Sequence, residues 1–152
     1  MKKVFVVLIV ALISMSVAAQ QQTGNEGDIA LIKKIIQTAY VEGLQNEGDT
    51  VKINSGFNPG FEMLMPTKEG ELKKYSLTVW KDKIRANLAA GLLPRKGAEK
   101  ISVKFLSVDV TGNAAVAKFE FYTGSKLTFV DYLSLYKFGD KWEIVSKIFH
   151  KV

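Results

Sequence analysis

The ionisable side chains best placed for chemistry lie in the last third of the chain, among apolar residues. Asp131 lies within an apolar and β-branched run, and His150 is the only histidine in the sequence. The dipeptides Gly124-Ser125 and Gly139-Asp140 separate three such runs. Turns of this composition connect neighbouring antiparallel strands, so these runs are predicted to pair as successive hairpins.

Hairpin pairing predicts which ionisable groups share a face of the sheet. If both turns are two-residue loops, Asp131 lies opposite Ile148 on one neighbouring strand and opposite Lys118 on the other. The face is then expected to carry Lys118, Glu120, Asp131 and His150 among apolar side chains. Asp131, with His150 or Glu120 as partner, could serve there as a general acid–base group. A single bulge in either hairpin would move these residues to opposite faces.

The same residues also have a purely structural interpretation. An ion pair of Asp131 with Lys118 or Lys147 would fix the strand register at the sheet surface, and structural ion pairs are commoner than catalytic carboxylates. A single histidine in a terminal strand is more often half-exposed packing than a ligand. Asp131 and His150 are therefore candidate catalytic residues without an assigned role.

Aromatic and methionine side chains from the middle of the chain predict a concave binding site. Such side chains suit a flat apolar or heteroaromatic ligand, although the same residues could simply close the core. Tyr40 and Trp80 are the preferred wall residues, because each has a polar tip that needs a partner when buried. The predicted ligand-binding residues are Tyr40, Phe57, Phe61, Met63, Trp80 and Asp131.

Several chemistries are disfavoured by what the sequence lacks. It has one histidine and no cysteine, and its carboxylates have neither zinc nor calcium spacing, so no metal site is expected. No nucleophile elbow and no glycine-rich phosphate loop are present, and no cofactor is expected. The net charge is +6, but the lysines are scattered and the arginines number two, which argues against a nucleic-acid partner.

The order of elements predicts an α+β fold. We expect a cone-like curved antiparallel sheet, with about four long strands plus a short hairpin, covered on one face by three N-terminal helices. The first expected helix is capped by Asp28 and runs to about Leu44, and a short second helix is capped by Asp49. Strands are expected over Phe61–Met65 and Leu72–Ser76. A third helix is expected over Leu77–Leu93 with Thr78 as a cap, and four strands follow from Ile101 onward.

The first residues have the composition of an export signal. Met1-Lys2-Lys3 precedes an apolar run too short for a bilayer span, and small residues lead to Ala19. We expect a signal peptide over 1–19, a flexible leader over 20–27 and one domain over 28–152. The protein is then periplasmic or secreted, without a stable membrane anchor.

Several stretches resemble a known family. They are Tyr40-Val-Glu-Gly-Leu44 with Gly48-Asp49, Phe57-Asn58-Pro59, Gly112-Asn113-Ala-Ala, Phe129-Val-Asp131-Tyr-Leu133-Ser-Leu135 and Lys141-Trp142-Glu-Ile144-Val-Ser-Lys147. Together they resemble the nuclear transport factor 2-like (SnoaL-like) superfamily, which includes ketosteroid isomerase and polyketide cyclases. More narrowly, they resemble the exported bacterial family called putative lumazine-binding. Relatives commonly carry histidine where this chain has Asn58, which removes a candidate base or metal ligand.

The resemblance implies a pocket between sheet and helices, and often a homodimer through the outer sheet face. The superfamily includes isomerases, dehydratases, cyclases and binding modules, so the fold alone does not define an activity. The leading expectation is an exported domain that binds a small apolar or heteroaromatic molecule without catalysis. The alternatives are an isomerase-like or dehydratase-like enzyme that uses Asp131, and a homodimeric protein-interaction module.

Overall fold

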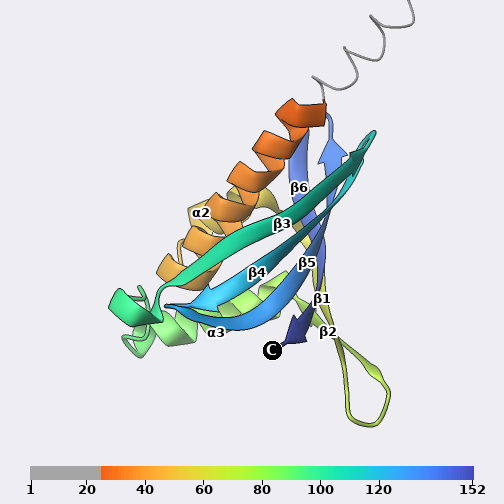
Figure 1. Cartoon of the computed structure of the whole chain (residues 1–152). Helices are drawn as coiled ribbons and strands as arrows, with labels where there is room; N and C mark the ends of the chain where they lie inside the picture. Colours follow the sequence, from red (N-terminus) through yellow and green to blue (C-terminus); the bar gives the residue numbers. More distant parts are fainter. Residues whose placement is uncertain (1–24) are drawn as a thin grey trace, which may run out of the picture.

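A long N-terminal helix lies across one face of a curved sheet (Figure 1). The computed structural model describes residues 25–152, so the predicted signal peptide and most of the predicted leader lie outside the described residues. Residues 25–35 are α-helical and continue into η1 (Ile36–Glu47), which has π-helical geometry. Gly48 follows with φ of 73°, a left-handed conformation that glycine adopts without strain and that ends the helix.

The helix differs from the prediction at its start. Asp28 is not a cap, because residues 25–27 are already helical. Its carboxylate instead accepts hydrogen bonds from Lys137 Nζ and Trp142 Nε1, both at 2.9 Å. Asp28 therefore attaches the helix to the hairpin at the C-terminal end of the chain.

Two shorter helices follow. Asp49 caps α2 (Thr50–Gly56) as predicted, since its carboxylate accepts the backbone N–H groups of Val51 and Lys52. The third helix, α3 (Leu77–Ala89), is capped by Ser76 and not by Thr78, and it ends before Leu93. Gly91, at φ of 70°, lies just after this helix.

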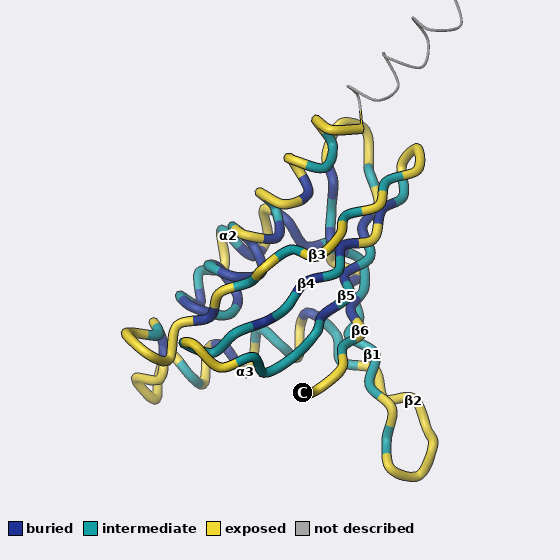
Figure 2. Tube along the Cα trace, in the orientation of Figure 1, coloured by how far each residue is buried: buried dark blue, intermediate teal, exposed yellow. Residues whose placement is uncertain are grey.

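The sheet has six strands in the order β2-β1-β6-β5-β4-β3. The strands are β1 (Phe57–Pro66), β2 (Leu72–Ser76), β3 (Ile101–Thr111), β4 (Ala114–Thr123), β5 (Lys126–Phe138) and β6 (Lys141–Lys151), with a short 3₁₀ turn, η2 (Gly97–Glu99), before β3. The predicted antiparallel sheet is thus a mixed sheet, because β1 pairs in parallel with β6. The β1–β2 hairpin extends this sheet, and its tip projects into solvent (Figures 1 and 2).

Two bulges change the strand register that the turn sequences predict. The loops themselves are two residues long, as expected. The β4–β5 pairing then shifts next to Phe121, and the β5–β6 pairing shifts next to Ser134. As a result Asp131 lies opposite Phe119 and Phe149, and the predicted pairing with Lys118 and Ile148 is wrong.

The core lies between the inner face of the sheet and the helices (Figure 2). Its largest fully buried side chains include Trp142, Tyr40, Phe61 and Phe119. The outer face is more exposed, and on it Val116 and Tyr136 are 45% and 48% accessible. No helix within residues 25–152 is long and apolar enough to span a bilayer.

Candidate functional site

Three polar side chains meet inside the core. Tyr40 and Asp131 have no exposed surface, and Lys147 is 5% exposed. The Tyr40 hydroxyl donates to Asp131 Oδ2 at 2.7 Å, and Lys147 Nζ donates to the same oxygen at 2.7 Å. Lys147 Nζ also donates to the Tyr40 hydroxyl oxygen, which closes a three-membered hydrogen-bonded group.

Each member comes from a different element. Tyr40 lies in η1, Asp131 in β5 and Lys147 in β6. The bulge near Ser134 determines that Asp131 and Lys147 project to the same inner face, since a one-residue shift inverts the side-chain direction. Gly43 determines the position of η1: a Cβ at this residue would lie 2.8 Å from Lys52 Cβ, so only glycine allows the close approach of α2.

The buried group perturbs the acid–base behaviour of two members. Burial, followed by the negative charge of Asp131, raises the pKa of Tyr40 well above its usual value of 10.0. Burial lowers the pKa of Lys147 below 10.5, and the interaction with Asp131 opposes that shift. The phenol therefore stays protonated and donates its hydrogen bond throughout the neutral range.

Aromatic rings surround the ammonium group of Lys147. Its nitrogen lies 4.9 Å from the ring centroid of Tyr40, 5.1 Å from Phe149, 5.7 Å from Phe121 and 5.9 Å from Trp80. Ring faces at these distances attract a cation, and most strongly where water is excluded. The rings and Asp131 together compensate for the loss of hydration.

A cavity of about 210 Å³ opens beside this group. Aromatic and thioether side chains dominate its wall, and the wall residues that carry side-chain polar groups are Tyr40, Gln45, Trp80 and Lys147. The lining residues are Tyr40, Gln45, Met63, Trp80, Phe121, Phe129, Lys147 and Phe149. An apolar wall with a few converging polar groups is typical of a small-molecule site.

The predicted site residues are only partly brought together. Tyr40, Met63 and Trp80 line the cavity. Phe57 and Phe61 are buried in the core beside it, where they pack against each other edge to face.

Of the predicted acid–base group, Asp131 alone is buried beside the cavity wall. Its Oδ2 accepts both hydrogen bonds, whereas Oδ1 is buried without a partner among the described residues. His150 is exposed and lies opposite Val130, away from Asp131. Glu120 bonds to Tyr122 and Lys104 instead, so the predicted pairing of Asp131 with His150 or Glu120 is wrong.

Lys147 and four other cavity residues, Gln45, Phe121, Phe129 and Phe149, were not predicted as ligand-binding residues. The predicted register placed Lys147, Phe121 and Phe149 on the face opposite to Asp131. The bulges reverse that assignment. The sequence did carry one indication, because Lys147 was a candidate ion-pair partner of Asp131, and this contact is present in the buried core instead of at the sheet surface.

Asn58, where a histidine was expected from the resemblance, serves a different purpose. Its amide nitrogen donates to Glu143 Oε2 at 2.7 Å, and its oxygen accepts the N–H of Gly60. It therefore connects the start of β1 to β6, outside the cavity. Within residues 25–152 no three acidic or histidine side chains converge as metal ligands would.

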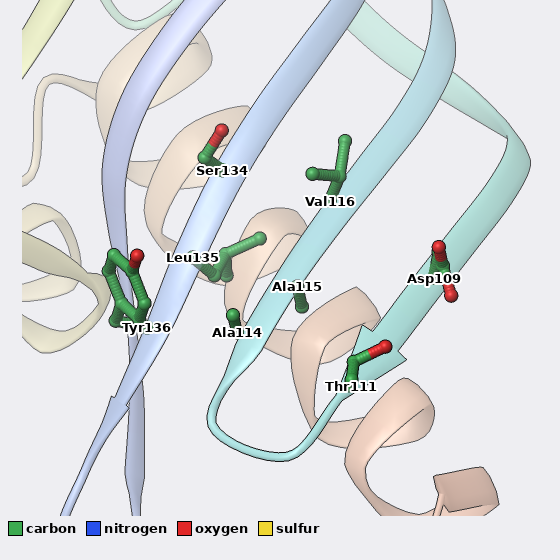
Figure 3. Close-up of a pocket in the computed structure, with 8 residues that line it drawn as sticks. All are labelled: Asp109, Thr111, Ala114, Ala115, Val116, Ser134, Leu135 and Tyr136. Atoms are coloured by element: carbon green, nitrogen blue, oxygen red, sulfur yellow. The ribbon is translucent and has the colours of Figure 1, made fainter.

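A second hollow, of about 290 Å³, lies on the outer side of the sheet (Figure 3). Residues of β3, β4 and β5 line it, among them Asp109, Val116, Ser134 and Tyr136. Its exposed Val116 and Tyr136 make it an open groove, and it contains no buried ionisable side chain. The cavity beside Lys147 is smaller, but the buried polar group at its wall makes it the better candidate site.

Known structures share this architecture. A nuclear transport factor 2-like protein of unknown function from Silicibacter pomeroyi is 22% identical, with a TM-score of 0.65 over 84% of this chain and 98% of that one. One from Shewanella baltica is 21% identical, with a TM-score of 0.64 over 83% and 94%. A protein from Streptomyces avermitilis described as a putative dehydratase is 16% identical, with a TM-score of 0.54 over 84% and 98%. These likenesses define the class of the fold, the nuclear transport factor 2-like cone.

The family follows from the sequence. The model of the family described as putative lumazine-binding matches residues 27–150. The chain therefore belongs to the putative lumazine-binding family of the nuclear transport factor 2-like fold. No curated protein matches the sequence.

Proposed function

We propose that this protein is an exported domain that binds a small, flat apolar or heteroaromatic molecule in the cavity beside Lys147. The cavity itself carries the proposal, because its wall combines five aromatic side chains and a methionine with a buried ammonium group and an amide. The family description agrees with a heteroaromatic ligand. The volume of the cavity, about 210 Å³, is smaller than the roughly 300 Å³ at which drug-sized pockets begin.

The size of the cavity limits the ligand to one or two fused rings. An apolar protein cavity of about 150 Å³ holds benzene. Naphthalene and lumazine are therefore suitable probes, one purely apolar and one heteroaromatic. Both can lie flat against Trp80, which is only partly buried at the cavity wall.

Nuclear magnetic resonance provides the test. Either probe should shift the indole N–H resonance of Trp80, whereas the Trp142 indole, bonded to Asp28, should not move. Met63→Trp should fill the cavity and abolish the shift. Leu64→Trp, one residue along β1 and on its opposite face, is the matched control and should retain it. Equal loss in both variants, or no shift with either probe, would contradict the proposal.

Acid–base catalysis by Asp131 is the second candidate function. The observation in its favour is the buried Oδ1, which has no hydrogen-bond partner among the described residues. A carboxylate oxygen of this kind can accept a proton from carbon next to a carbonyl group. The protein should then accelerate deuterium exchange into the methyl group of 2-acetylnaphthalene, and Asp131→Asn should abolish that acceleration. Exchange at the buffer rate with wild-type protein would exclude this function for this probe.

Homodimerisation through the outer sheet face is a third candidate. That face carries Val116, Tyr136 and Ile148, all about half exposed. Covering such side chains would stabilise a dimer. Sedimentation velocity of wild-type and Tyr136→Glu protein should show a dimer that the substitution dissociates, and a wild-type monomer at all concentrations would refute it.

Export is part of the proposal and has its own test. Expression of the full chain in a two-membrane bacterium should yield a periplasmic product whose first residue is Gln20. N-terminal sequencing of the periplasmic fraction measures this. A product that retains Met1 and stays in the cytoplasm would contradict it.

A further inference from the structure

The ammonium group of Lys147 has one donor more than its protein partners use. A lysine ammonium carries three N–H donors. Two are accounted for by Asp131 Oδ2 and the Tyr40 hydroxyl oxygen. No further acceptor bonds it among residues 25–152, and Lys147 lines the cavity. The third donor is thus available to a molecule inside the cavity.

The charges around the cavity are already balanced. Asp131 and Lys147 form a buried pair with no net charge. An anionic ligand would bring a second negative charge close to Asp131, with one ammonium to share between them. Uncompensated charge is expensive beside a pair that is itself buried almost completely.

A cationic ligand is disfavoured for two reasons. It would meet the ammonium of Lys147, and like charges repel strongly where water is excluded. The ring faces that would otherwise attract it, those of Tyr40 and Phe149, already face Lys147 Nζ at 4.9 and 5.1 Å. The aromatic cage is occupied by the protein's own lysine.

We propose that the cavity selects neutral ligands whose carbonyl oxygen accepts the third N–H of Lys147, and that it discriminates against organic cations and carboxylates of the same size. This inference rests on the proposed ligand-binding function and specifies its chemistry. The carbonyl gains a charge-assisted hydrogen bond, and the surrounding rings contact the remainder of the ligand.

Four naphthalenes with substituents of similar size separate the contributions. They are 2-acetylnaphthalene as the neutral acceptor, 2-isopropylnaphthalene as its apolar counterpart, 2-naphthoate as the anion and 2-naphthylmethylammonium as the cation. Titration calorimetry at pH 7 should show 2-acetylnaphthalene binding about tenfold more tightly than 2-isopropylnaphthalene, as expected for a hydrogen bond to a charged donor. Both ions should bind more weakly than the apolar compound.

Variants then attribute the preference to Lys147. Lys147→Met alone leaves Asp131 buried without its partner, so the informative protein is the double variant Asp131→Asn with Lys147→Met, in which the new amide can still accept from Tyr40. In this double variant the affinities of 2-acetylnaphthalene and 2-isopropylnaphthalene should be about equal. Lys118→Met, which removes a lysine from the outer face, should keep the wild-type ratio.

The outcomes distinguish this inference from the function on which it rests. If no naphthalene binds, both fail. If all four bind without an acetyl preference, the cavity is a ligand site but the selectivity inference is wrong. Tightest binding of 2-naphthoate, with proton uptake at Asp131, would also overturn the inference, as would an acetyl preference that survives in the double variant.

Discussion

Lys147 reaches Asp131 diagonally across two neighbouring strands. In the sheet Asp131 lies opposite Phe149, two residues beyond Lys147 along β6, yet the charged groups meet at 2.7 Å. Diagonal neighbours are about 7–8 Å apart at the backbone, a gap that a long side chain bridges easily. The pair therefore depends on the β5–β6 register as much as on the two side chains.

Loss of Asp131 should be costly for stability. Asp131→Asn leaves the ammonium of Lys147 buried without a counter-charge, and breaking a buried pair in this way costs about 3–5 kcal/mol. Urea unfolding at pH 7 measures the free energy. The double variant with Lys147→Met should recover most of the loss, because no unpaired charge remains. A single variant as stable as wild type would show that the pair does not contribute.

Tyr40 should make stability decline at alkaline pH. The pKa of Tyr40 is raised in the folded protein, so above pH 10 the unfolded chain loses a proton that the folded chain retains. Its contribution is fully present below pH 10 and is lost as the pH rises toward the folded pKa. Tyr40→Phe should cost about 1–3 kcal/mol at pH 7, since Asp131 loses a buried donor, and should flatten the decline.

Denaturant unfolding between pH 8 and 11 checks this alkaline effect. Tyr132→Phe is the control, because Tyr132 lies on the outer face opposite Lys118. It should keep the wild-type profile. A Tyr40→Phe profile with an unchanged slope above pH 10 would contradict the assignment.

Two glycines in the first helix should respond in opposite ways to alanine. A Cβ at Gly43 would lie 2.8 Å from Lys52 Cβ and 3.0 Å from the backbone nitrogen of Ile53, so Gly43→Ala must separate η1 from α2. We expect a loss of about 1–3 kcal/mol, as for other overpacked positions. Gly27 is helical with nothing within 4 Å, so Gly27→Ala should stabilise by up to about 1 kcal/mol. Thermal unfolding followed by circular dichroism compares the two, and equal effects would refute the close-approach argument.

Asn46 should be essential for attaching the first helix to β3. Its amide donates to the Ile101 carbonyl at 2.9 Å and accepts the Ile101 N–H at 2.8 Å, and the side chain is buried. Asn46→Ala leaves both backbone groups without partners, at a cost of about 1–3 kcal/mol for each one that water cannot reach. Hydrogen exchange should show the Ile101 amide losing protection while the Leu133 amide keeps it. Protection retained at Ile101 would show that another group replaces Asn46.

The sequence predicted the elements better than it predicted their alignment. Glycine-containing turns and the capping residue Asp49 act locally, and both were identified correctly. The bulges beside Phe121 and Ser134 have no comparable local signature, because the residues around them continue the apolar strand pattern. The predicted faces were therefore inverted at Asp131, although the correct strands were paired.

The candidate site was accordingly predicted only in outline. Tyr40, Met63 and Trp80 were found because aromatic and methionine side chains suit a cavity wall. Lys147 faces the cavity because of the bulge in the β5–β6 pairing, and Tyr40 lies in the π-helical η1. A bulge and a π-helical segment are both departures from regular backbone geometry, which the pattern of apolar and polar residues along the chain does not reveal.

The place of β6 in the strand order has a consequence for how the chain folds. The last described strand lies between β5 and β1, and its parallel pairing with β1 joins the first and last strands across most of the chain. Because β6 lies between β1 and β5, the β1–β2 hairpin cannot join the sheet of β3, β4 and β5 until Lys141–Lys151 has been synthesised. Such distant contacts form late and slowly, so a nascent chain cannot complete this sheet early. A polypeptide that crosses a membrane unfolded, as we propose for this one, gains from that delay.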